Sequence, residues 1–162
     1  MVEPSIGAPD SPTVVIVGAA SRDTDMSDPR GWRLGGTVTY AALAAASVGV
    51  HVRALVGVDE AASAAHELDV LRSAGVDVRP VPLESGPVFD NLRLPDGGRE
   101  QVALSTSDTL PVSALPDRWG DPAAALLGPV AAELGDDWAG AFGSRTTTAL
   151  AWQGMLRRIR AG

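Results

Sequence analysis

Lysine and cysteine are both absent from this sequence, so its thirteen strongly basic side chains are all arginines. Without lysine, the chain cannot form a Walker-type phosphate loop, a Schiff base or a pyridoxal-phosphate anchor. Without cysteine, it has no disulfide framework, thiolate nucleophile or zinc–thiolate site, which suits a reducing compartment. We therefore expect a cytoplasmic protein whose chemistry does not use these side chains.

The chain also has little that would direct it to a membrane or to nucleic acid. Residues 1–10 lack the basic and apolar regions of a secretory signal, and the longest stretch of low charge, 34–51, is interrupted by glycines. The net charge is −7 and the arginines are scattered along the chain, so a phosphate backbone would be repelled. We expect neither a membrane nor a nucleic acid as a partner.

The sequence does contain enough apolar residues to form one buried hydrophobic core. With 162 residues and a hydrophobic content of 45%, it predicts one domain, or a large part of one, over 13–162. Residues 1–12 are rich in Pro, Ser and Gly without periodicity, so we expect them to form a flexible N-terminal tail.

Strand and helix signals alternate through the first half of the chain. β-branched runs predict strands that are buried in a sheet, and Ala-rich stretches that end at a glycine predict helices. Proline at 80 and 82 restricts the strand that contains them to a sheet edge. This rhythm is typical of a parallel α/β sheet. In chain order, we expect a strand at 14–17, a loop at 19–33, a helix at 37–48, a strand at 50–58, a helix at 60–74 and an edge strand at 76–83.

A hairpin interrupts this rhythm in the second half. Two strand-like runs flank Pro95-Asp96-Gly97-Gly98, a turn sequence that favours antiparallel pairing, and such a hairpin is usually an appended lid. The predicted elements from there on are strands at 87–94 and 99–105, a strand at 125–130, a short helix at 136–142, a strand at 146–152 and a final segment at 153–160.

The glycine pair Gly35-Gly36 is the first candidate for a binding site. Glycines at a helix start let a ligand approach the backbone, and the amides of the first turn can donate to ligand oxygens. A glycine pair before a helix is also a common tight turn, so the pair alone does not separate the two interpretations. The two histidines, His51 and His66, have no second ligand at metal spacing, so we expect no metal site.

In its longer context, this glycine pair resembles the N-terminal signature of the pfkB-type, ribokinase-like carbohydrate kinases. The resemblance implies an α/β fold with a mainly parallel, three-layer, Rossmann-like sheet and a small β-hairpin lid. It covers about residues 14–160 but only the first half of the family's domain, so the fold is expected to be incomplete. The matching elements are Gly35-Gly36, the small-residue helix Thr37–Val48, Gly49, the strand His51–Val56 and Gly57-Val58-Asp59.

The resemblance also implies a set of sugar-binding residues. Asp23, a few residues beyond the first strand, would bind sugar hydroxyls, although without the resemblance it is more typical of a loop carboxylate or a cap. Tyr40 stands where many members carry an Asn that contacts the sugar. On the lid, Phe89 would stack on the sugar and Asn91 would exchange hydrogen bonds with it. The implied acceptor site comprises Asp23, Gly35, Gly36, Tyr40, Phe89 and Asn91.

The function implied is ATP-dependent phosphorylation of a sugar or polyol, with Mg²⁺ as the accompanying ion. The family's ATP site and its Gly-Ala-Gly-Asp motif, whose Asp is the catalytic base, lie farther along, and this sequence contains no such motif. We therefore expect no catalytic residue here, weak binding of ATP and Mg²⁺, and no activity by the chain alone. The alternatives are a non-catalytic, sugar-binding or self-associating remnant that forms a homo-oligomer, and one half of a split kinase that pairs with a separate C-terminal half.

Overall fold

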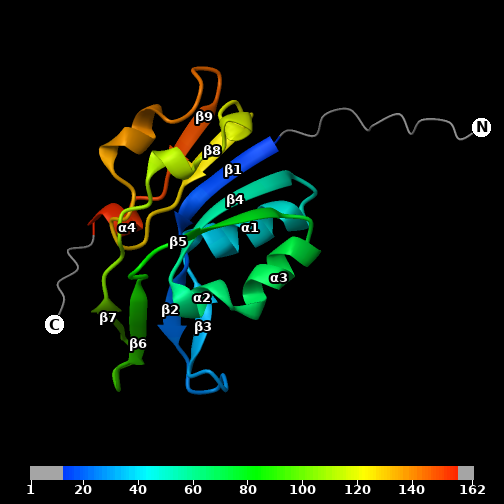
Figure 1. Cartoon of the computed structure of the whole chain (residues 1–162). Helices are drawn as coiled ribbons and strands as arrows, with labels where there is room; N and C mark the ends of the chain where they lie inside the picture. Colours follow the sequence, from blue (N-terminus) through cyan, green and yellow to red (C-terminus); the bar gives the residue numbers. More distant parts are fainter. Residues whose placement is uncertain (1–12, 157–162) are drawn as a thin grey trace, which may run out of the picture.

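The computed structural model describes residues 13–156, so the predicted tail at 1–12 and the end of the last predicted segment, 157–160, lie outside the described residues. Five strands form a central sheet in the order β5-β4-β1-β8-β9, and every neighbouring pair is parallel (Figure 1). This confirms the predicted α/β fold, including the edge position of the proline-containing strand. The strands are β1 Thr13–Ala19, β4 His51–Val58, β5 Asp77–Pro82, β8 Ala124–Leu127 and β9 Thr147–Leu150.

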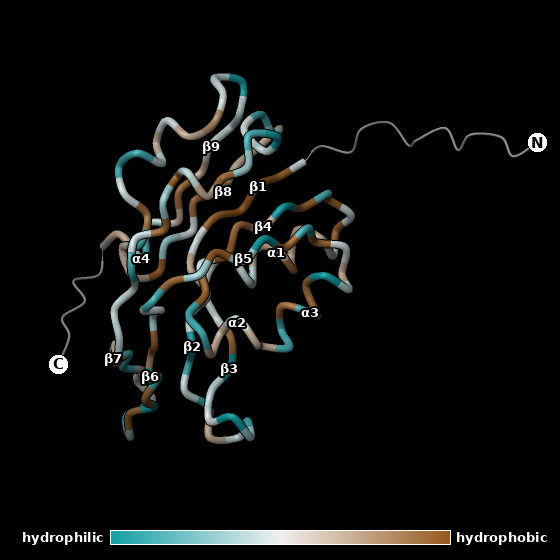
Figure 2. The backbone as a smooth tube through the Cα atoms, in the orientation of Figure 1, coloured by the Kyte–Doolittle hydropathy of each residue, from teal (hydrophilic) through white to brown (hydrophobic). Residues whose placement is uncertain are grey.

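Helices cover both faces of this sheet, which gives the expected three layers. Alternation along β1 sends Ile16 to one face and Val15 and Val17 to the other, and each joins a separate buried cluster. The apolar residues follow the sheet strands through the middle of the molecule (Figure 2). One face carries α1 Thr37–Ser47, α2 Glu60–Ser63 and α3 His66–Ser73, and the other carries the 3₁₀ helices η1 Val112–Ala114, η2 Asp117–Trp119 and η3 Asp136–Gly140.

A second sheet of four strands projects from the first, where a two-stranded lid was expected. Its order is β3-β2-β6-β7, with β2 antiparallel to β3 and parallel to β6, and β6 antiparallel to β7. We call it the lid sheet. The predicted hairpin supplies half of it, and the segment predicted as a loop supplies the rest. The strands are β2 Ser21–Thr24, β3 Trp32–Gly35, β6 Val88–Arg93 and β7 Arg99–Ser105.

The prediction of a loop over 19–33 is therefore wrong. Strand β2 is short and polar, so it has no hydrophobic pattern that would predict a strand. Its side chains bind polar partners and do not pack in an apolar core. Arg22 donates to Asp59 at 2.9 Å, and Ser21 donates to Asp23 at 2.9 Å. These bonds satisfy groups that would be costly to bury alone.

The predicted helix over 60–74 is also wrong as a single element. Its start is confirmed, since the Asp59 side chain accepts a hydrogen bond from the Ala62 amide at 2.8 Å and caps α2. Ala65 then adopts extended backbone and is buried, so the helix breaks and α3 begins at His66. The break starts a new helix whose first turn places Glu67 against the lid sheet.

The remaining elements up to β9 are shorter than predicted. The strand expected at 125–130 ends at Leu127, because Pro129 has no N–H to continue the ladder after the last bond, from the Gly128 amide to Val17. The helix expected at 136–142 is the 3₁₀ turn η3, and the last described element is α4 Gln153–Leu156. Within residues 13–156, no helix is long and apolar enough to cross a bilayer.

Glu67 joins the turn between β2 and β3 to the helix layer. Its carboxylate accepts from the Leu34 amide at 3.1 Å and from the Arg30 guanidinium at 2.7 and 3.0 Å. The guanidinium also lies 4.5 Å from the centre of the Trp32 ring. Burial raises the pKa of Glu67, but the hydrogen bonds from Arg30 and Leu34 outweigh burial and lower it to about 2. The ionised carboxylate therefore stabilises the attachment of the lid sheet.

Replacing Glu67 with glutamine should lower the free energy of unfolding at neutral pH by about 1–2 kcal/mol, because a charged pair is lost at a partly solvated position. The pKa of Glu67 is lowered on folding from 4.5 to about 2. Its stabilisation is therefore complete above pH 4.5 and is lost as the pH falls toward 2. Urea unfolding of the wild type and Glu67→Gln across this range should give stabilities that converge at the acid end.

The matched control is Asp69→Asn on the same helix. Asp69 is 77% exposed and pairs only with Arg72 among the ion pairs of the described residues, so its loss should change stability by less than about 0.5 kcal/mol. A difference between the wild type and Glu67→Gln that does not change with pH would contradict the role of the ionised carboxylate.

Candidate functional site

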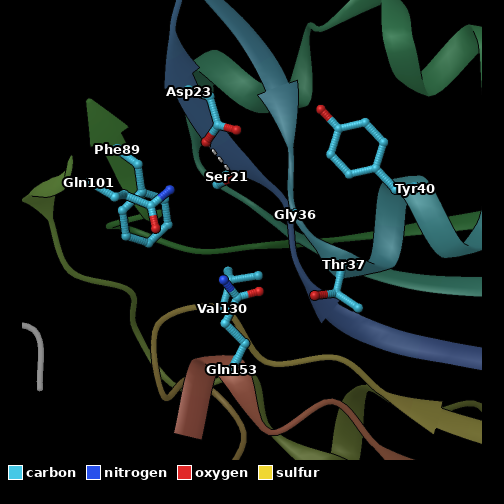
Figure 3. Close-up of a pocket in the computed structure, with 9 residues that line it drawn as sticks. All are labelled: Ser21, Asp23, Gly36, Thr37, Tyr40, Phe89, Gln101, Val130 and Gln153. Atoms are coloured by element: carbon cyan, nitrogen blue, oxygen red, sulfur yellow. Dashed lines mark hydrogen bonds between the residues drawn. The ribbon is translucent and has the colours of Figure 1, made fainter. Parts of the chain in front are cut away.

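A cavity of about 260 Å³ lies between the lid sheet and the carboxyl end of the central sheet (Figure 3). We call it the acceptor cavity. Parallel strands bring the residues that follow them to one edge, which is where open α/β sheets bind ligands. Its volume lies just below the ~300–1,000 Å³ of drug-sized pockets, so it suits a smaller molecule. The lining residues are Ser21, Asp23, Gly36, Thr37, Tyr40, Phe89, Gln101, Val130 and Gln153.

The glycine pair lets the start of α1 approach the junction of β1 and β2. Gly36 has φ 99°, and a Cβ there would lie 2.7 Å from the Ala19 carbonyl oxygen. A Cβ on Gly35 would collide with the Asp23 carboxylate and lie 2.9 Å from the Ser21 hydroxyl. A side chain at Gly36 would push α1 away from the backbone, whereas one at Gly35 would displace the Asp23 and Ser21 side chains. The pair therefore brings the first turn of α1, with its amide donors, to the acceptor cavity.

Glu133 holds the floor of the cavity in place. Its carboxylate is 1% exposed, and it accepts hydrogen bonds from the backbone amides of Ala19 at 2.8 Å, Val130 at 3.1 Å and Ala131 at 2.8 Å. A buried carboxylate requires such donors. Since Val130 lines the cavity and Ala19 ends β1, this one side chain sets their relative positions. We call this arrangement the Glu133 junction.

The lid sheet supplies the opposite wall through Phe89 and Gln101. Phe89 is buried, and Gln101 lies across the hairpin from Asn91, to whose Oδ1 its amide donates at 2.8 Å. Asn91 itself is not among the residues that line the cavity. Asn91 instead holds the side chain of Gln101, which does line the cavity.

The structure thus brings together four of the six residues named from the sequence, namely Asp23, Gly36, Tyr40 and Phe89. Gly35 packs against Asp23, and Asn91 lies one hydrogen bond behind Gln101. Five further lining residues were not named from the sequence: Ser21, Thr37, Gln101, Val130 and Gln153.

Some of these five carry a signal in the sequence. The register of the predicted hairpin places Gln101 opposite Asn91, and Thr37 directly follows the glycine pair. Val130 and Gln153 follow strands β8 and β9, so only the order of strands in the sheet brings them to the cavity. Glu133 has no signal at all, because its partners are backbone amides, one of them far away in the chain.

The described lining of the acceptor cavity does not fit ATP or Mg²⁺. No group of three or more His, Asp or Glu side chains in residues 13–156 could hold a metal ion. Among the described residues that line the acceptor cavity, none carries a cationic side chain to neutralise a triphosphate. These lining residues suit a polar acceptor better than a phosphoryl donor.

No family model and no curated protein matches the sequence. Solved structures do match, and the fold they share is ribokinase-like. A pyrophosphate-dependent kinase in the ribokinase family, complexed with a pyrophosphate analog and myo-inositol, is 18% identical with a TM-score of 0.67, over 89% of this chain and 50% of that one.

Two sugar kinases also match. The ribokinase from Cryptococcus neoformans var. grubii serotype A, in complex with ADP, is 15% identical with a TM-score of 0.56, over 86% of this chain and 49% of that one. The fructokinase from Xylella fastidiosa is 18% identical with a TM-score of 0.53, over 71% and 40%. The present chain spans half or less of the length of these structures.

Gly36→Ala should lower the free energy of unfolding by about 2–4 kcal/mol, because a positive φ and a backbone collision coincide there. Gly49→Ala is the matched control, since Gly49 also has a positive φ, 82°, but an added methyl group would meet nothing within 4 Å. It should cost only about 1 kcal/mol. Urea denaturation of both variants measures the difference, and equal losses would show that the close approach of α1 to β1 contributes nothing.

Proposed function

We propose that this chain binds a sugar or related polyol in the acceptor cavity and positions one hydroxyl group for phosphorylation, as the acceptor-binding half of a carbohydrate kinase. The observation that carries the proposal is that the glycine-opened helix and the lid sheet form two walls of one cavity of about 260 Å³. The fold supports it, since a neighbour of the same fold was solved with myo-inositol, a polyol.

Each wall has a role in this proposal. The Asp23 carboxylate accepts hydrogen bonds from acceptor hydroxyls, and the neighbouring hydroxyls of Ser21 and Thr37 extend the polar surface. Phe89 and Tyr40 lie on opposite sides of the cavity (Figure 3), and in this proposal their rings contact the C–H surface of a sugar.

Three further residues act through the backbone or through a neighbour. Gly35 and Gly36 admit the ligand close to the first turn of α1. Asn91 orients Gln101, which carries an amide to the cavity from the lid sheet. The lid sheet then excludes water from the bound hydroxyl.

The phosphoryl donor, ATP with Mg²⁺, binds in this proposal to a segment other than residues 13–156. The neighbours themselves differ in this respect, since one is a pyrophosphate-dependent kinase and another was solved with ADP. Phosphoryl transfer requires positive charge around the transferred group, and no described lining residue of the cavity supplies a cationic side chain. We place the reaction in the cytoplasm, a reducing compartment that suits a chain without cysteine.

The exposed edge of β9 is where we propose that the donor-binding part joins. Thr147, Thr148 and Ala149 are exposed on this last strand of the sheet, and beyond it Trp152 is 65% exposed and Met155 42%. An open edge strand beside apolar side chains favours pairing with another strand. The donor-binding part is a separate C-terminal half. In the alternative without catalysis, a second copy of this chain covers the same edge in a homo-oligomer.

A second function, polyol binding without catalysis, is favoured by the lack of a donor site among the described residues. Assays of the chain alone with a sugar panel should show no product from ATP and Mg²⁺ or from pyrophosphate and Mg²⁺. Product that appears when the donor-binding half is added would favour the kinase over the binding protein. Turnover by the chain alone would contradict our placement of the donor site.

Asp23→Ala should weaken polyol binding at least tenfold, about 1.4 kcal/mol, because charge-assisted hydrogen bonds to hydroxyls are lost. Isothermal titration with myo-inositol, ribose and fructose measures it. Asp25→Ala is the control, since Asp25 belongs to the same hairpin but pairs with Arg33 at 2.8 Å outside the cavity. Equal affinity of the wild type and Asp23→Ala would rule out the acceptor site.

A further inference from the structure

Helix α1 has an apolar surface on the side that faces away from the central sheet. Its sheet side includes Val38 and Ala42, both fully buried. On the opposite side Tyr40 is 62% exposed, Leu43 39% and Val48, at the end of the helix, 78%. A helix that is largely apolar on every side is typically buried on every side. The outer surface of α1 is therefore suited to a partner.

We call this outer surface the α1 stripe. Its members recur at intervals of three and four residues, so they lie on one face of the helix. They are the exposed residues Tyr40, Leu43, Ala44, Ser47 and Val48. The helix is eleven residues long, so the stripe extends about 16 Å.

The neighbouring helix shows that outer positions in this layer need not be apolar. Helix α3 lies beside α1 (Figure 1) and exposes His66, Asp69 and Arg72, the last two joined by an ion pair at 2.7 Å. In contrast, no residue from 34 to 50 is an acidic or basic residue. Charged outer positions keep a helix in contact with water, whereas an uncharged apolar stripe favours association.

Charge and shape both point to a second copy of this chain as the partner. The net charge is −7, so two copies repel each other over most of their surface and approach best where neither is charged. The small Ala44 at the centre of the stripe lets two helices come close. With the two helices antiparallel, Tyr40 of one copy lies opposite Val48 of the other, so the stripe is complementary to itself.

We propose that the chain forms a two-fold symmetric dimer in which the α1 stripes of two copies pack against each other. A stripe of about 16 Å by 10 Å is well below the ~800 Å² per partner of a stable interface, so the dimer is weak, with a dissociation constant of about 10–100 µM. The contact is separate from the β9 edge, because α1 packs on β1 and β4. This inference goes beyond the proposed function and does not depend on it.

Sedimentation equilibrium of the full chain, at concentrations on both sides of about 10–100 µM, should show a monomer–dimer equilibrium. Ala44→Glu places two like charges at the centre of the contact and should raise the dissociation constant about tenfold or more. Glutamate suits an exposed helix position, so this variant should fold. Leu104→Glu is the matched control, since Leu104 is 58% exposed on the lid sheet and the same charge there should leave the constant unchanged.

A mixing experiment tests the two-fold arrangement. Ala44→Arg alone should also dissociate the dimer, whereas an equal mixture of Ala44→Glu and Ala44→Arg should form a heterodimer, because position 44 of one copy meets position 44 of the other. Failure of this mixture to pair, when each variant alone is monomeric, would overturn the two-fold contact.

Hydrogen exchange of the wild-type chain provides a measurement that needs no variant. The amides of α1 should exchange more slowly at high than at low protein concentration, and those of the lid sheet should not change. A chain that stays monomeric well above the expected constant would overturn the inference. A dimer that survives Ala44→Glu but is abolished by Leu104→Glu or by Trp152→Glu would place the contact on the lid sheet or beside the β9 edge, and would overturn it too.

Discussion

The buried carboxylate of Glu133 is the contact on which the candidate site depends. It takes hydrogen bonds from the backbone at the end of β1 and from the loop that follows β8, two places far apart in the chain. Because its hydrogen-bond donors are backbone amides, the Glu133 junction fixes the cavity floor relative to the end of β1, just before β2 begins. The position of Asp23 in β2 follows from that geometry.

The lid sheet depends on a second set of contacts. Arg22 and Asp59 connect β2 to the end of β4, and Glu67 connects the β2–β3 turn to α3. These connections are ionic, and they add to the apolar packing of Leu34 and Phe89, by which the lid sheet also contacts the rest of the molecule. We therefore expect the ionic part of this attachment to weaken at low pH and at high salt.

The sequence predicted the parts of the fold that follow local rules. β-branched runs, glycines after helices and a turn-flanked hairpin yielded the parallel sheet, helix α1 and strands β6 and β7. It did not predict β2 and β3, whose polar residues are satisfied by partners that only the tertiary fold supplies. The lining residues of the site divide in the same way. Gly36 and Phe89 belong to local sequence motifs and could be predicted, whereas only the order of strands in the sheet brings Gln153 to the cavity.

The participation of Gln153 in the cavity has a consequence for how the protein forms. The residues that line the cavity run from Ser21 to Gln153 in α4. Nearly the whole described chain must therefore be synthesised, and its last strand must join the sheet, before the cavity is complete. A ligand held there would connect early and late segments and would bind only the completed fold. By mass action, its presence would then protect the whole domain against unfolding, including the ionic attachment of the lid sheet.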